Sequence, residues 1–112
     1  MSRRRQRLKA SVSEYLDADG GSLKLRGSMT PGSRLEYQAL LKAGLDREDA
    51  WQRATEFLFE RLAASWTIAG LEITRQAELL ARYRFASSQE RQFVRDSLRA
   101  HMSEHFPELA VP

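Results

Sequence analysis

Two histidines and a glutamate near the C-terminus are the side chains in this sequence best suited to bind a metal ion. His101, Glu104 and His105 lie in the stretch His-Met-Ser-Glu-His. On a helix, this spacing places two imidazoles one turn apart with a carboxylate beside them. Imidazole and carboxylate groups both bind Zn²⁺, and a glutamate beside zinc-bound water can act as a general base. The first question is therefore whether these residues form a zinc site.

The pattern His-x-x-Glu-His resembles the motif of the inverted zinc proteases. That resemblance implies a third ligand from a distant helix, and the sequence holds no equivalent stretch. Pro107 also ends the helix just beyond His105. We therefore expect no metal, and we interpret His101, Glu104 and His105 as surface or interface residues. A cationic histidine near a helix C-terminus is favoured by the helix dipole.

Other catalytic signatures are missing from the sequence. The absence of cysteine excludes disulfides, thiolate metal sites and a cysteine nucleophile. No glycine-rich phosphate loop occurs, and no Gly-x-Ser-x-Gly motif marks a nucleophilic serine. We therefore expect a protein that is not an enzyme and that requires no cofactor.

A basic N-terminal arm is the clearest interaction feature. The first nine residues carry a charge of +5, whereas the other 13 basic and 15 acidic side chains leave the rest of the chain at −2. Guanidinium groups bind phosphates, so nucleic acid is the first candidate ligand. An acidic protein surface is the second, and a solubilising role stays open. The basic residues of the arm are Arg3, Arg4, Arg5, Arg7 and Lys9.

Recurring capping patterns predict the helices. The pattern Ser-x-x-Glu supplies acceptors for unpaired amide groups in a first helical turn. It occurs at Ser11, Ser33 and Ser87, with an acidic version at Asp46, and predicts helices that start near residues 12, 34, 47 and 88. Glycines predict helix ends at 20–21, 44 and 70. A further helix is expected over residues 72–84.

These elements predict an all-α fold, a bundle of four to five helices. The length of 112 residues, 42% apolar and 29% charged, suits one globular domain. We expect a basic arm over residues 1–10, a short helix and a glycine-rich linker over 11–32, and a helical domain over 33–112.

Residues 22–26 alternate between polar and apolar side chains and permit one short strand. In a ribbon-helix-helix arrangement this strand would pair across a dimer, with Leu23 and Leu25 inward. Lys24 and Arg26 would then point toward the major groove of DNA. We therefore expect Lys24 and Arg26 to belong, with the basic arm, to a site for nucleic acid or for an acidic partner.

The helix predicted over residues 47–69 carries apolar side chains on several sides. Phe57 and Phe59 lie about 200° apart around a helix axis, so at least one of them lies off the apolar stripe that faces the core. A helix of this kind is central in its domain or buried between subunits. We expect a homodimer with Trp51, Phe57, Phe59 and Trp66 at its interface, while core packing within one chain remains the alternative.

These features favour a non-catalytic interaction protein, an adaptor or assembly subunit that acts as an oligomer. The alternative is a nucleic-acid-binding regulator that uses the basic arm. No apolar run approaches the length of about 18 residues that a membrane span requires. We therefore expect no membrane partner, and we expect a cytoplasmic location because the chain lacks cysteine and an apolar signal segment.

Overall fold

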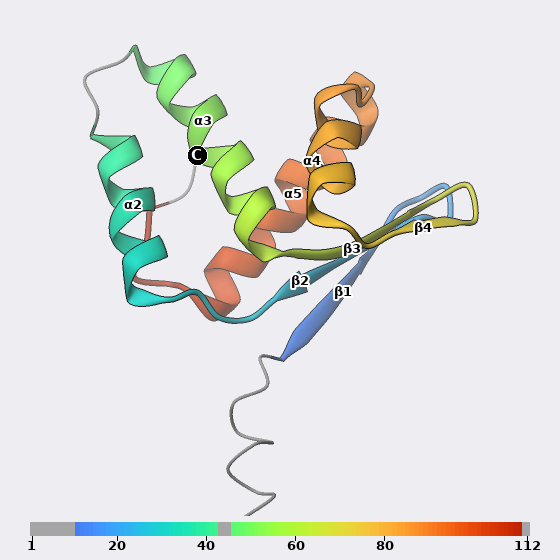
Figure 1. The fold of residues 1–112 in the computed structure, drawn as a ribbon, viewed down its shortest axis with the longest axis horizontal. Coiled ribbons are helices and arrows are strands. Elements are labelled where there is room, and N and C mark those ends of the chain that lie inside the picture. The colour runs from blue at the N-terminus through green and yellow to red at the C-terminus, as the bar shows by residue number, and fades with distance from the viewer. Residues whose placement is uncertain (1–10, 43–45, 111–112) are drawn as a thin grey trace, which may run out of the picture.

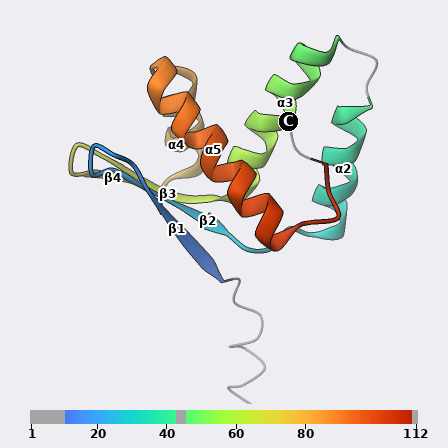
Figure 2. The ribbon, with the colours of Figure 1, turned by 180° about the vertical axis from the view of Figure 1, so that it is seen from behind.

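A computed structural model describes residues 11–42 and 46–110. These residues form one four-stranded antiparallel sheet and four helices, all on the same side of the sheet (Figures 1 and 2). The all-α prediction was therefore wrong. The elements are β1 (Val12–Leu16), β2 (Ser22–Arg26), α2 (Pro31–Leu41), α3 (Arg47–Leu62), β3 (Ala63–Ile68), β4 (Leu71–Ile73), α4 (Gln76–Arg84) and α5 (Ser88–His105).

The first predicted helix is a strand. Residues 11–32 hold the hairpin of β1 and β2 in place of a short helix and linker. Side chains in β1 alternate between exposed and half-buried, as the two-residue period of a strand requires. The chain turns through a three-residue loop that ends at Gly20, whose φ of 87° suits the left-handed position of such a turn. Ser11 and Glu14 matched a capping pattern, but this stretch pairs with β2 as a strand.

The third predicted helix ends earlier than expected. Helix α3 stops at Leu62, and the chain continues directly into β3 and β4, which are joined by Ala69 and Gly70. Both turn residues have positive φ, at 52° and 80°, the signature of a tight hairpin turn. Gly70, interpreted as a helix end, is therefore part of a β-turn.

Several helix boundaries agree with the capping patterns. The Asp46 carboxylate accepts hydrogen bonds from two amides in the first turn of α3, which begins at Arg47 as predicted. Ser87 and Glu90 form the complete capping box of α5, which ends at His105 before Pro107. Helix α2 begins at Pro31, where Thr30 rather than Ser33 provides the cap.

The predicted strand over residues 22–26 is confirmed, but its neighbours exclude the ribbon-helix-helix arrangement. Strand β2 lies between β1 and β3 within one chain, so both of its edges are occupied. It therefore cannot pair across a dimer. Leu23 and Leu25 point inward and are fully buried, as expected.

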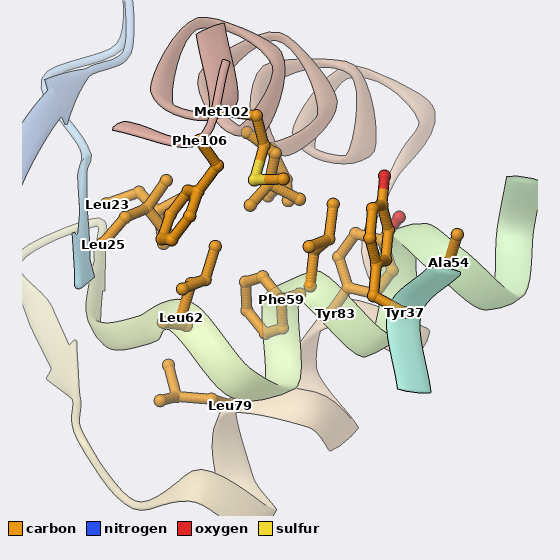
Figure 3. Packing of buried hydrophobic residues seen from close by; sticks show 14 of the residues in the cluster. Leu23, Leu25, Tyr37, Ala54, Phe59, Leu62, Leu79, Tyr83, Met102 and Phe106 are labelled. Carbon is orange, nitrogen blue, oxygen red and sulfur yellow. The ribbon is translucent and has the colours of Figure 1, made fainter. Parts of the chain in front are cut away.

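The core lies between the inner face of the sheet and the helices (Figure 3). Phe59 of α3 is at its centre, packed edge-on against Trp66 at 5.7 Å and stacked on Tyr83 at 5.0 Å between ring centroids. One core thus joins β3, α3 and α4. None of the four helices in residues 11–42 and 46–110 has both the length and the apolar character needed to cross a membrane.

Candidate functional site

His101 is buried within the chain, whereas the sequence predicted a surface or interface residue. Its side chain is fully buried, with Nε2 2.7 Å from the carbonyl oxygen of Arg26 and Nδ1 2.8 Å from the hydroxyl of Tyr15. A carbonyl oxygen can only accept, so Nε2 carries the hydrogen and donates it. Nδ1 then accepts from the Tyr15 hydroxyl. Both ring nitrogens are engaged, and they join α5 to β1 and β2.

His105 and Glu104 do not complete a metal site around His101. The His105 ring lies 4.4 Å from the His101 ring, and its Nε2 lies 3.2 Å from the Ser13 hydroxyl and 3.5 Å from Glu104. Ser13 and Glu104 therefore both approach Nε2 of His105. In a catalytic triad, by contrast, the serine and the carboxylate contact different nitrogens of the histidine ring. Across residues 11–42 and 46–110, no three histidine or acidic side chains are grouped as metal ligands.

Adding zinc is expected to leave the stability of the protein unchanged. A metal at His101 would have to displace Tyr15, because Nδ1 provides the only lone pair of the ring. The melting temperature should be the same with equimolar zinc and with chelator, measured by differential scanning calorimetry. A rise in melting temperature with zinc that disappears in His101→Gln would contradict this assignment.

The predicted nucleic-acid residues are only partly covered by the structure. Arg3, Arg4, Arg5, Arg7 and Lys9 lie outside the described residues. Lys24 and Arg26 are on the outer face of the sheet, away from the helices. The Arg26 guanidinium donates to the carbonyl of Ala63 at 2.7 Å, so this side chain has an internal partner.

The four residues predicted at an oligomer interface do not form one surface. Phe59 and Trp66 are buried in the core of one chain, and Phe57 stacks on Tyr37 at 6.4 Å beneath the guanidinium of Arg61. The apolar breadth of residues 47–69 is therefore explained by packing within the chain. Trp51 differs, since 40% of its surface is exposed.

Trp51 lies at a groove between α3 and α5, which we call the arginine groove. Its volume is about 420 Å³, within the range of small-molecule sites. It is lined by Glu48, Trp51, Gln52, Thr55, Glu56, Leu58, Tyr83, Arg91, Arg95, Leu98 and Arg99.

One wall of the arginine groove is basic. Arg91, Arg95 and Arg99 recur every four residues along α5, which places them on one helical face. Arg91 donates to the carbonyl of Arg84 and Arg95 to the amide oxygen of Gln92. Within the described part of the chain, neither Arg91 nor Arg95 has a carboxylate partner, and the buried Nε of Arg91 has no hydrogen-bond partner. The groove thus holds cationic groups whose charge is not neutralised by a contacting carboxylate.

The floor and rim of the groove are apolar and aromatic. Leu58, Leu98 and Tyr83 are buried beneath it, and burial raises the pKa of the Tyr83 phenol while Arg95 and Arg91 oppose the rise. At the rim, the guanidinium of Arg47 lies over the Trp51 indole, 4.7 Å from the ring centroid. A ligand here would meet both an apolar surface and positive charge.

The wall formed by α3 is acidic. Glu56 is held by an ion pair with Arg84 at 3.1 Å, and Glu48 stands exposed in the first turn of the helix. Glu48 is therefore the acidic group that the α3 wall presents opposite the arginines of α5, because Glu56 is paired with Arg84. This polarity would orient a ligand whose charges lie on one side, and it disfavours one that is negative all around.

Comparisons with protein-family models, curated proteins and solved structures found no match for this chain. Among the residues that line the arginine groove, the sequence predicted an interaction role for Trp51 alone, at a homodimer interface. The four-residue spacing of its arginines was a visible signal, but only the fold shows that they share a hollow with Trp51 and Tyr83.

Proposed function

We propose that this protein is a non-catalytic interaction protein whose arginine groove binds an acidic segment of a partner protein. The observation that carries the proposal is the pair Arg91 and Arg95, which line a hollow with an apolar floor and lack a carboxylate partner among the described residues. Carboxylates form charge-assisted and often bidentate hydrogen bonds with guanidinium groups.

The residue types around the groove support a protein partner. Arginine, tryptophan and tyrosine dominate the binding energy of protein interfaces. Trp51 is 40% exposed at the rim of the groove, and Tyr83 lies in its floor. Leu58 and Leu98 provide an apolar floor for a side chain that anchors the segment.

Nucleic acid is the less favoured ligand for this groove. A phosphate backbone presents negative charge along its length, and Glu48 on the α3 wall would repel it. An acidic peptide can place its carboxylates toward α5 and turn other side chains toward α3. The basic arm remains the candidate contact for a nucleic acid.

The proposal is tested with a fluorescein-labelled peptide of alternating glutamate and leucine, followed by fluorescence anisotropy. We expect the full-length protein to bind it, and Arg95→Glu to weaken binding by roughly tenfold or more, or about 1.4 kcal/mol. Arg95 is suited to this change because it is exposed and its hydrogen bond is to the neutral Gln92.

Arg53→Glu is the matched control, because Arg53 is an exposed arginine of α3 that does not line the groove. It makes the same change in net charge and should leave the affinity for the peptide within about twofold. Equal weakening by both variants would show that only net charge matters and would refute the groove as the site. Binding of a DNA duplex that depends on Arg95, with no binding of the acidic peptide, would show that the groove is a nucleic-acid site and would refute the proposal.

A further inference from the structure

Strand β1 has one unoccupied edge among the described residues. It pairs with β2 alone, in an antiparallel register that joins Val12 to Arg26 and Leu16 to Ser22. The amides of Gly27 and Asp17 donate to the carbonyls of Ser11 and Gly21, so odd-numbered residues of β1 bond toward β2. Because antiparallel ladders alternate, the backbone groups of Val12, Glu14 and Leu16 point away from β2.

The helix side of β1 is held firmly in place. Tyr15 donates to buried His101, and Ser13 contacts His105. These contacts from alternate residues fix the strand against α5. The free edge is therefore pre-ordered, so pairing with another strand would cost little additional entropy.

The outer face of β1 carries exposed apolar side chains. Val12 is 51% exposed and Leu16 is 73% exposed, with Glu14 between them. Proteins commonly block an edge strand with proline, a bulge or charge. Strand β1 has no proline, and its register with β2 is continuous. Of these three features, β1 therefore has only a charged residue, Glu14.

We propose that β1 pairs antiparallel with β1 of a second copy of this chain, about a two-fold axis at Glu14. In this register Val12 lies opposite Leu16 of the second copy, and Leu16 lies opposite its Val12. The exposed apolar side chains then cover one another, and the outward backbone groups form about six hydrogen bonds. The two sheets join into one.

The charges along the outer face allow this register. Glu14 lies beside Lys24 across the β1–β2 ladder, so the row through the axis reads lysine, glutamate, glutamate, lysine. Each carboxylate has an ammonium group as its neighbour. The two glutamates still repel each other, which keeps the pairing weak and provides a specific test.

Sedimentation equilibrium of the full-length protein tests the proposal. The wild type should form a dimer, Leu16→Lys should weaken it by tenfold or more, and Glu14→Gln should tighten it by severalfold. Leu16 is exposed, so its replacement should leave the monomer folded, which circular dichroism checks. Leu71→Lys is the matched control, because Leu71 is 67% exposed on β4 at the opposite edge of the sheet.

A protein that stays monomeric even as Glu14→Gln would overturn this proposal, and so would a dimer that Leu71→Lys dissociates and Leu16→Lys leaves intact. The dimer should persist in Arg95→Glu, since β1 contributes no residue to the arginine groove. Loss of peptide binding and loss of dimer formation can thus be told apart.

Discussion

Phe59→Ala is expected to lower the free energy of unfolding by about 3 to 5 kcal/mol. The Phe59 side chain is fully buried and makes ring contacts with both Trp66 and Tyr83. The variant loses the transfer free energy of the ring, opens a cavity and removes two aromatic contacts. Phe59→Glu should prevent folding, because the carboxylate would be buried in the core without a partner.

Chemical denaturation monitored by circular dichroism measures this change. Phe85→Ala is the matched control, since Phe85 is 87% exposed and its removal should cost less than about 0.5 kcal/mol. The result also bears on the interface first expected at Phe59. If Phe59→Glu is a folded monomer while the wild type is an oligomer, then Phe59 contacts another subunit and the packing described for one chain is incorrect.

Acidification is expected to destabilise the protein through His101. Burial lowers the pKa of His101 from its ordinary value of 6.5, and neighbouring His105 lowers it further, whereas the Arg26 carbonyl and Glu104 oppose the shift. Tyr15, the other partner of the ring, approaches from β1. The folded state therefore holds the neutral imidazole.

The direction of the pH effect follows from proton linkage. Below pH 6.5 the unfolded chain binds a proton at His101 that the folded chain does not, so the unfolded state gains stability as the pH falls. This contribution to folding is complete above pH 6.5 and is lost as the pH falls toward the lowered pKa of the folded state. The slope for one proton is at most about 1.4 kcal/mol per pH unit.

Free energies of unfolding measured between about pH 7.5 and 5 test this prediction. His101→Gln keeps an amide donor that can reach the Arg26 carbonyl but cannot titrate. It should be less stable than wild type at neutral pH, and the difference should shrink as the pH falls. A difference that stays constant across this range would show that His101 is not the group responsible.

Local capping chemistry was readable from the sequence. Asp46 and Ser87 each have side-chain oxygens that satisfy amides within the next three residues, so the starts of α3 and α5 depend on adjacent residues alone. The end of α5 at His105 is also decided locally, because Pro107 disfavours a helical conformation in the residue before it. The alternation in residues 22–26 likewise identified β2.

Local patterns failed where two structures could satisfy them. Ser11 and Glu14 match a capping box, yet the same stretch alternates like a strand, and pairing with β2 decides the outcome. Trp66 continues a helical stripe from Leu62, yet it lies in β3, opposite Leu23. Strand pairing joins residues that are far apart in the sequence, so a local pattern cannot predict it.

The sequence by itself determined the caps of the two longest helices, one strand and the separation of a basic arm from a nearly neutral body. The tertiary structure alone decided that His101 is buried between Tyr15 and the Arg26 carbonyl, and that Arg91 and Arg95 face Trp51 across a hollow. Capping depends on atoms a few residues apart, whereas burial and charge pairing depend on which distant segments the packed core brings together.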